Sequence, residues 1–469
     1  MRLCLRTEHC LEQFNLERFG MNVSRRRSHT CTVVSRHLIL TLSLSLSILS
    51  FHSASAQALI SEFAKLAPTD LNAADQFGGA VGIGGGQAIV GSINHDSVAS
   101  NAGAAWVFNS STGALVTKLE AGDGEIGDNF GFSTAVGGGL ALVGATGEDN
   151  EVTNLATGSG AAYLFNSTTG AQVNKFEPDD GQTNDGFGRS VDIGGGLGAI
   201  GNPGDDDANS DAGSVFLYNL TTGSNLHILT AGDAGTTDQL GSAVATDGTH
   251  VVGGAPGADA GSTVGAGAAY VFDTSTGTQQ HKLTASDGVQ NDLFGISVDI
   301  SGDRIIIGAP FHDADGETAG AAYVFDTSDG SQLFKLVPDD IAAGDQFGIS
   351  VGISGDFAII GSEFDDDDGL SSGSAYVFDL TTGNQISKFT ASDAAQGDFL
   401  GGAVALDAGK AIIGATLDDD LGNSSGSAYL ASVPEPEAYA LFISLTLTIF
   451  CLYRQKIARV NPAGAQPEA

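Results

Sequence analysis

Hydrophobic and polar positions between Phe294 and Asp326 form three short runs separated by turn residues. Apolar and polar side chains alternate in 296–300, apolar residues fill 305–307, and a third apolar run occupies 321–325. Glycine, proline and aspartate separate the runs, and β-branched residues are frequent within them, which is typical of short β-strands. A fourth run, 332–336, follows after one more turn. The pattern predicts an up-and-down sheet of four antiparallel strands.

The same unit occurs seven times along the chain. Its anchor is an aspartate two residues before a Phe–Gly or Leu–Gly pair, and the glycines of successive pairs are 53, 57, 53, 54, 53 and 53 residues apart. Four strands in a period of this length predict a β-propeller. The fold is therefore predicted to be all-β, a seven-bladed β-propeller with four antiparallel strands in each blade. We expect the anchor aspartate to accept backbone N–H bonds and fix the turn before the first strand; it occurs at Asp75, Asp128, Asp185, Asp238, Asp292, Asp345 and Asp398.

The two ends of the repeat region predict how the ring closes. The first run, Leu59–Leu66, has the pattern of a fourth strand, whereas the last unit, which starts at Leu400, has only three strands. We therefore expect the N-terminal strand to complete the last blade and to remove two open sheet edges. Lysine occurs in six of the seven fourth strands. We expect it to block edge-to-edge pairing there.

Residues 1–56 have the pattern of a secretory signal peptide. Three arginines at 25–27 precede an apolar run from Leu38 to Phe51, and small residues follow up to Ala56. This order of basic, apolar and small segments predicts export with cleavage after Ala56 or Ala58, and translation starts at Met1 or Met21. All four cysteines lie in the terminal segments, so the predicted propeller, 57–432, contains neither disulfides nor thiolate metal sites.

The acidic residues are concentrated in two kinds of loop. Residues 57–436 contain 51 acidic and 9 basic residues, which gives a net charge of −42. Of the acidic residues, 39 lie in two kinds of connection: from the second to the third strand of a unit, and from the fourth strand to the first strand of the next unit. Because strand direction alternates, both kinds of connection emerge on one face of the ring. Crowded carboxylates repel one another unless cations intervene, and hard divalent ions prefer oxygen ligands.

The sequence therefore predicts calcium binding on this face, with a solvated anionic surface as the alternative. The candidate metal ligands are the acidic residues of four second-to-third loops: Asp205, Asp206, Asp207, Asp313, Asp315, Glu317, Asp365, Asp366, Asp367, Asp368, Asp418, Asp419 and Asp420.

No catalytic constellation is evident in the repeats. Five histidines lie in the repeats, at unrelated positions, and we expect most of them on the surface: His95, His227, His250, His281 and His312. The protein is therefore predicted not to be an enzyme, although paired carboxylates could support hydrolysis. Nucleic acid is not expected as a partner, because phosphate contacts need a basic surface.

The Phe–Gly pair before the first strand and the Gly–Ala–Pro after the second, at Gly254–Pro256 and Gly308–Pro310, resemble FG-GAP repeats. The resemblance covers about 59–432 and implies the seven-bladed propeller of integrin α subunits and many exported bacterial proteins. Integrin-type repeats have a calcium loop between the first and second strands. Here those turns carry too few oxygen ligands, so the resemblance implies no metal site there.

The C-terminal segment, 433–469, resembles a PEP-CTERM sorting signal. Val433–Pro436 contains the Pro–Glu–Pro motif, an apolar run follows from Ala438 to Tyr453, and Arg454, Lys456 and Arg459 come next. The resemblance implies a transmembrane helix, recognition by an exosortase and delivery to the cell surface or extracellular matrix. A retained membrane anchor is the alternative, and in both cases the propeller lies outside the membrane.

The sequence thus predicts an exported, surface-sorted and monomeric propeller that acts as a non-enzymatic binding or adhesion module, with calcium as a possible cofactor. The expected partner is an extracellular glycan, a matrix polymer or a surface protein. Two alternatives remain: a structural component of the extracellular matrix, and a carbohydrate-active hydrolase or lyase that uses paired carboxylates.

Overall fold

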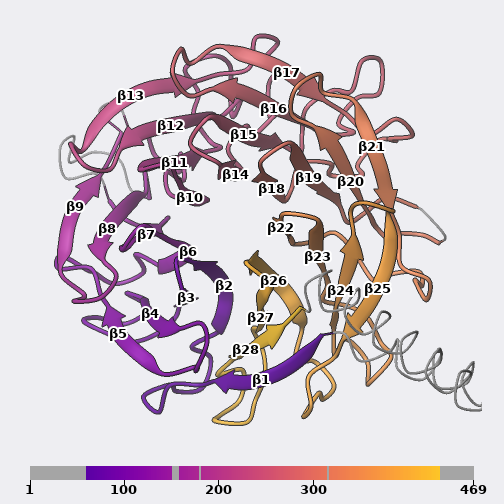
Figure 1. Ribbon diagram of the computed structural model, residues 1–469. Coiled ribbons are helices and arrows are strands. Elements are labelled where there is room, and N and C mark those ends of the chain that lie inside the picture. The colour runs from indigo at the N-terminus through magenta and orange to yellow at the C-terminus, as the bar shows by residue number, and fades with distance from the viewer. Residues whose placement is uncertain (1–59, 150–157, 179–180, 314–315, 434–469) are drawn as a thin grey trace, which may run out of the picture. The chain divides into compact units, whose positions relative to one another are not determined.

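The computed structural model describes residues 60–149, 158–178, 181–313 and 316–433, which form seven four-stranded sheets around a central channel (Figure 1). The predicted seven-bladed all-β propeller is confirmed. The predicted signal peptide (1–56) and the predicted membrane helix of the sorting signal lie outside the described residues. Within the described ranges, no helix is long and apolar enough to cross a membrane.

Each blade has an inner strand at the channel, then a second, a third and an outer strand. Blade 1 is β2–β5, blade 6 is β22–β25, and blade 7 joins β26–β28 to β1. The inner strands are β2 (Phe77–Gly84), β6 (Phe130–Gly137), β10 (Val191–Gly194), β14 (Ala243–Thr246), β18 (Val298–Ser301), β22 (Val351–Ser354) and β26 (Leu400–Asp407). The second strands are β3 (Gln87–Ser92), β7 (Leu140–Ala145), β11 (Leu197–Asn202), β15 (His250–Ala255), β19 (Arg304–Ala309), β23 (Phe357–Ser362) and β27 (Lys410–Ala415). The third strands are β4 (Ala104–Asn109), β8 (Ala161–Asn166), β12 (Ser214–Asn219), β16 (Ala268–Asp273), β20 (Ala321–Asp326), β24 (Ser374–Asp379) and β28 (Ser427–Ser432). The outer strands are β5 (Leu115–Leu119), β9 (Gln172–Phe176), β13 (Ser224–Leu229), β17 (Gln279–Leu283), β21 (Gln332–Leu336), β25 (Asn384–Phe389) and β1 (Ser61–Leu66).

Burial follows the position of a strand within its blade. The second and third strands are buried along almost their whole length, because both faces of these central strands pack against neighbouring blades. The outer strands keep exposed and half-buried positions up to a final buried apolar residue. Continuous apolar runs therefore form the central strands, and mixed runs form the rim.

The hydrophobic core lies between blades. Phe77 of blade 1 is fully buried and packs with Ile412 and Leu430 of blade 7. A parallel bridge joins the Phe or Leu of every anchor to a glycine just before the third strand of the preceding blade, as in Phe294 with Gly267. The Phe or Leu of the anchor thus fills the space between adjacent sheets.

Two glycines of the repeat permit this close approach. A Cβ atom on Gly308 would lie 1.9 Å from the carbonyl oxygen of Gly348 in the next blade. Gly348 itself has φ +95°, a conformation that L side chains rarely adopt. The second strand of one blade can therefore contact the backbone of the next blade directly.

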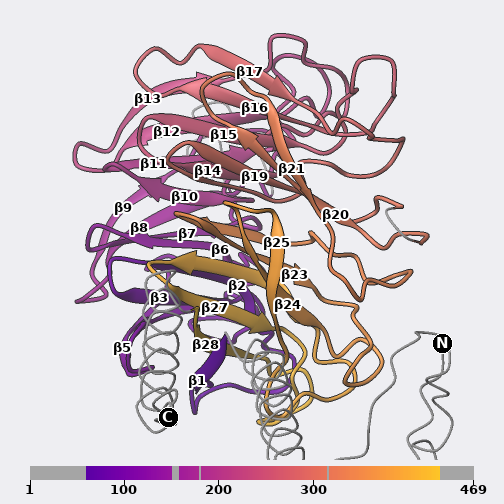
Figure 2. The same cartoon turned by 45° about the vertical axis from the view of Figure 1, so that its right-hand side comes forward.

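The ring closes through the N-terminal strand. β1 pairs antiparallel with β28, with a register that runs from Ser61 opposite Ser432 to Leu66 opposite Ala428. β1 lies beside β28 in both views (Figures 1 and 2). The bridge between Phe77 and Gly426 repeats at this joint the contact made at the other six. The predicted closure is confirmed.

Candidate functional site: the loop face

The two acidic kinds of loop lie side by side, as predicted. The second-to-third loop of one blade accepts backbone N–H bonds from the loop that leads into the next blade. Gly127 donates to the carbonyl oxygen of Ser100 (3.2 Å), and Gly397 donates to that of Leu370 (3.0 Å). These paired loops form one face of the ring, which we call the loop face.

The anchor aspartate closes the turn before each inner strand. In all seven blades one of its carboxylate oxygens accepts the backbone N–H of the residue three positions earlier, at 2.5–2.8 Å. The predicted structural role of this aspartate is confirmed. A buried carboxylate that accepts an N–H in this way holds the loop in one conformation.

A lysine stands over an aromatic ring in six blades. Lys388 of β25 lies opposite Tyr376 of β24, and its Nζ is 5.0 Å from the centre of the ring. The equivalent distances in the other five blades are 5.0–5.7 Å. The ring attracts the cation and also covers its aliphatic stem.

The same ammonium groups bind loop carboxylates. Lys388 Nζ lies 2.9 Å from Asp365 and 2.6 Å from Asp367. Lys65 Nζ lies 2.8 Å from Asp418 and 2.6 Å from Asp420. The lysines were expected to block the outer edge, but the structure gives them another role: they fold back over the blade and neutralise part of the negative charge of the loop face. Burial alone lowers the pKa of Lys65, but hydrogen bonds to the carboxylates, including Asp393, outweigh this effect and raise it.

A loop residue lies beside the position of the lysine and the aromatic ring in every blade, and the three positions together are called the cluster. This loop residue comes 17 residues after the anchor glycine. The residues at this position are His95, Glu148, Asp205, Ala258, His312, Asp365 and Asp418, and all seven are buried. Two of the histidines thus occupy equivalent buried positions, so the expectation of unrelated surface sites is wrong for them.

In blade 1 the histidine takes the place of the loop carboxylate. Lys118 Nζ donates to His95 Nε2 (2.9 Å), and His95 Nδ1–H donates to the anchor Asp75 (2.7 Å). In blade 2 the equivalent residue is Glu148, which binds Lys175 at 2.7 Å. Burial raises the pKa of Glu148 to about 7, although Lys175 opposes the shift. The lysine thus occurs in both blades, while its buried partner differs between them.

The family model described as FG-GAP repeat matches seven segments of the chain: 60–108, 114–165, 171–218, 224–272, 278–325, 331–378 and 384–431. The chain belongs to the FG-GAP repeat family. Each match starts at an outer strand and ends at a third strand, so the repeat of the family is offset by one strand from the blade. No curated protein matches the chain.

The predicted metal ligands of this FG-GAP propeller have different surroundings. Asp365, Asp367, Asp418 and Asp420 surround lysines. Other carboxylates accept backbone N–H bonds within their own loops: Asp206 from Asp211, Asp313 from Thr318 and Asp366 from Ser371. Glu317, Asp368 and Asp419 are exposed at the surface, and Asp315 lies outside the described residues. Calcium binding stays a prediction.

Asp205 and Asp207 of blade 3 form the remaining pair. Asp205 is buried and accepts hydrogen bonds from the backbone N–H of Asp207 (2.9 Å) and from Ser214 Oγ (2.5 Å). The outer strand of this blade has Ile228 where the other six have lysine. Blade 3 is therefore the blade whose loop carboxylates lack the lysine of the repeat.

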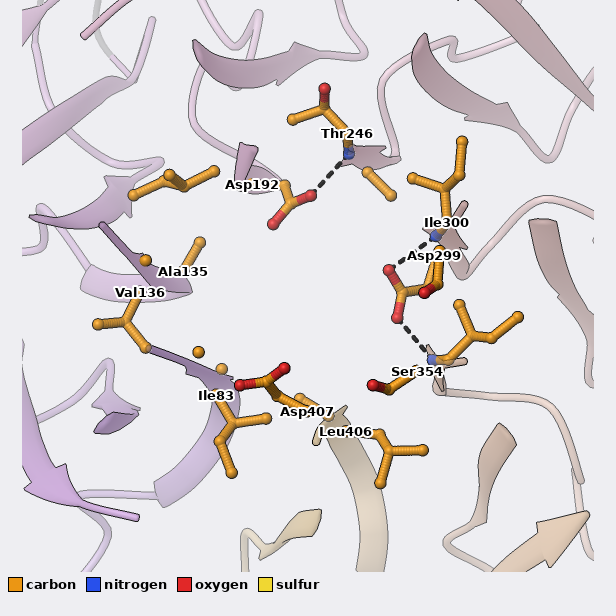
Figure 3. A pocket seen from close by; sticks show the side chains of 18 of the residues that line it. Ile83, Ala135, Val136, Asp192, Thr246, Asp299, Ile300, Ser354, Leu406 and Asp407 are labelled. Carbon is orange, nitrogen blue, oxygen red and sulfur yellow. Dashed lines mark hydrogen bonds between the residues drawn. The ribbon is translucent and has the colours of Figure 1, made fainter. Parts of the chain in front are cut away.

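The central channel of the propeller is a second candidate site, which the sequence analysis missed. It encloses a cavity of about 370 Å³, lined by the inner strands of all seven blades (Figure 3). Asp192 accepts the backbone N–H of Thr246 in the next blade (2.6 Å), and Asp299 accepts that of Ile353 in the next blade (2.7 Å). The other five blades have glycine or alanine at this position. An aspartate among these small residues was the available signal.

The channel carboxylates are hard to ionise. Burial raises the pKa of Asp192 to about 6. Burial and the nearby charge of Asp192 raise the pKa of Asp299 to about 8. The two groups tie neighbouring blades together through backbone N–H bonds, and at neutral pH Asp299 stays mostly protonated whereas Asp192 is mostly ionised.

Proposed function

We propose that this protein is a non-enzymatic binding or adhesion module that engages its partner through the loop face. FG-GAP propellers are modules typical of binding and adhesion. The observation that carries the proposal is the composition of the loop face. It combines most of the acidic residues with large apolar side chains that stand free of the core: Val98, Ile126, Val264, Val289, Leu370 and Leu421.

Such a surface suits recognition rather than solubility alone. Ile126 is 78% exposed and Leu370 is 60% exposed, and each lies in a loop that is hydrogen-bonded to the neighbouring blade. Apolar side chains held on a rigid backbone lose little entropy when a partner covers them. Exposed apolar groups rimmed by charge are typical of interaction sites.

The proposal includes the cellular setting predicted from the chain ends. The protein is exported, sorted by an exosortase through its C-terminal signal, and displayed at the cell surface or in the extracellular matrix. Its partner is an extracellular glycan, a matrix polymer or a surface protein, and calcium supports the interaction. A purely structural matrix role and a carbohydrate-active hydrolase are the alternatives.

A binding screen with matched variants tests the proposal. The full-length protein is immobilised and exposed to extracellular glycans, matrix polymers and surface proteins. Replacing Ile126, Leu370 and Leu421 by serine is expected to weaken binding by about fivefold or more, since buried apolar anchors dominate interfaces. The control is Val173→Ser, an equally apolar residue on the outer rim, which is 56% exposed. It should bind like the parent.

Two results would contradict the proposal. Equal loss of binding in the loop-face and rim variants would show that the loop face is not the contact surface. Cleavage of a glycan that single Asp→Asn changes abolish would instead favour the hydrolase.

A further inference from the structure

Blade 3 differs from the other six blades at the centre of its cluster. Its outer strand has Ile228 at the lysine position, and its third strand has Phe216 where the others have tyrosine or tryptophan. Ile228 is 52% exposed. In blades 6 and 7 the buried loop carboxylate accepts hydrogen bonds from a lysine ammonium and a tyrosine OH, and blade 3 lacks both groups at these two positions.

The carboxylates of the cluster are nevertheless retained. Asp205 and Asp207 stand 17 and 19 residues after the anchor glycine, as Asp418 and Asp420 do in blade 7. Their loops make the same bonds: Asp207 N donates to Asp205 at 2.9 Å, and Asp420 N donates to Asp418 at 3.0 Å. A serine of the third strand donates to the buried carboxylate in both blades. The loop of blade 3 therefore has the form that holds a cation in blade 7.

The cluster of blade 7 has the spacing of a metal site. Carboxylate oxygens of Asp393, Asp418 and Asp420 lie within 4.8 Å of one another. Lys65 Nζ fills the space between them, at 2.6–2.8 Å from each. An ammonium and a metal ion are alternative ways to neutralise such a set of oxygens.

Asp205 has no such cation. Only 8% of the residue is exposed, and no lysine, arginine or histidine of the described ranges forms an ion pair with it. In blade 7 the equivalent Asp418 receives Lys65 Nζ at 2.8 Å and Tyr429 OH at 2.9 Å on one oxygen. A buried carboxylate without a counter-charge is costly. A cation from solution would remove that cost.

An additional oxygen ligand is present in blade 3. Asn202 is 1% exposed, and its amide lies against the carboxylate of Asp205, with Nδ2 3.5 Å from Oδ2. Its Oδ1 has no hydrogen-bond partner among the described residues. The equivalent residue of the other six blades is serine or alanine. Oδ1 is thus a buried amide oxygen without a partner, on an amide whose other atom, Nδ2, faces Asp205. A flip of the amide brings Oδ1 to the carboxylate, and calcium accepts such an oxygen as a ligand.

We propose that blade 3 binds a calcium ion in the place that lysine occupies in the other six blades. Asp205, Asp207 and the Oδ1 of Asn202 are the protein ligands, and water completes the coordination. With so few protein ligands, the expected dissociation constant is about 10⁻⁴–10⁻³ M, the range of extracellular calcium modules. This inference rests on the proposed calcium dependence of the loop face and narrows it to one blade.

Calcium binding is measured on the full-length protein without any partner, by isothermal titration and by thermal unfolding in chelator and in calcium. At about ten times the dissociation constant, calcium should raise the Tm by about 2 °C. Asp207→Asn should abolish most of that shift. The matched control is Asp420→Asn, the same change at the equivalent residue of blade 7, where Lys65 is the cation; it should keep the full shift.

A second variant introduces the lysine and the tyrosine of the other blades at the proposed calcium site. Ile228→Lys with Phe216→Tyr should raise the Tm in chelator and remove the response to calcium. A Tm unchanged by calcium, or equal responses of Asp207→Asn and Asp420→Asn, would overturn the blade 3 site. If the parent protein binds its partner as tightly in chelator as in calcium, only the calcium dependence of partner binding is refuted. The blade 3 site is tested separately, because calcium binding is measured without a partner.

Discussion

At the residue scale, the loop face consists of repeated three-part clusters. A lysine of the outer strand, an aromatic residue opposite it and a buried loop residue recur around the ring, as in Lys388, Tyr376 and Asp365. Burial alone raises the pKa of Asp365, but hydrogen bonds from Tyr376 and Lys388 outweigh it and lower that pKa. A buried carboxylate of this kind is tolerated because each of its oxygens has a donor. The strong acidity of the sequence is therefore partly neutralised inside each blade.

The carboxylates of the channel predict a dependence of stability on pH. Asp299 has a pKa of about 8 in the folded protein against its ordinary value of 3.8. Between these values the folded state keeps a proton that the unfolded chain has released, so the parent loses stability as the pH rises. Asp299→Asn lacks this group. The Tm of the variant relative to the parent should therefore increase from about pH 4 to pH 8.

Thermal unfolding across that range measures the effect. Asp303→Asn, a change at an exposed turn residue of the same blade, is the control and should shift the Tm equally at every pH. A pH-independent difference between Asp299→Asn and the parent would show that Asp299 is ionised like an ordinary carboxyl.

At the scale of the elements, glycines decide how closely the blades pack. The second-to-last residue of the second strand is a glycine whose Cα lies against the backbone of the next blade, so the central strands contact their neighbours without an intervening side chain. The aromatic residue of the anchor then fills the wider space beside that contact. The glycine recurs because adjacent sheets are close together at one place, and the anchor residue recurs because they are farther apart beside it.

Substitutions at two glycines of blade 5 distinguish the cost of steric crowding from the cost of backbone strain. Gly308→Ala places a Cβ 1.9 Å from the oxygen of Gly348 and should destabilise the protein by about 3 kcal/mol. Gly302 has φ +60°, but a Cβ added there would meet no atom within 4 Å, so Gly302→Ala should cost only about 1 kcal/mol. Urea unfolding compares the two. Equal losses would mean that the close contact between blades adds nothing to stability.

At the scale of the whole molecule, one strand from the start of the chain holds the ring closed. β1 supplies the outer strand of blade 7 and also its lysine, Lys65, which reaches three loop carboxylates. Closure therefore joins the ends of the propeller through both a sheet and an ion-pair cluster. A closed ring leaves none of its seven joints without a partner.

Deleting residues 57–66 removes this closure. The truncated chain should unfold at a lower temperature and aggregate, because β28 becomes an open edge and Asp418 loses Lys65. Calorimetry and light scattering measure both effects. A synthetic peptide of residues 57–66, added in excess, should partly restore the Tm. A truncated chain that melts like its parent and stays monomeric would contradict the role of β1.

The sequence by itself determined the architecture of the propeller. Strand-length apolar runs, turn residues and a fixed period specify seven similar sheets, because these signals are local and occur seven times. The strand left over at each end specifies the closure. The role of the anchor aspartate was also predictable, since its partner is a backbone N–H only three residues away.

Only the tertiary structure decided what the charged side chains do. Lys65 and Asp418 are 353 residues apart in the sequence, and Asp192 and Thr246 are 54 apart and lie on different blades. Whether a carboxylate meets an ammonium, a backbone N–H or solvent depends on how loops from different strands converge, which no local pattern specifies. For the same reason, the absence of lysine from blade 3 could be interpreted only from the tertiary structure, which shows that loop carboxylates of other blades surround a lysine.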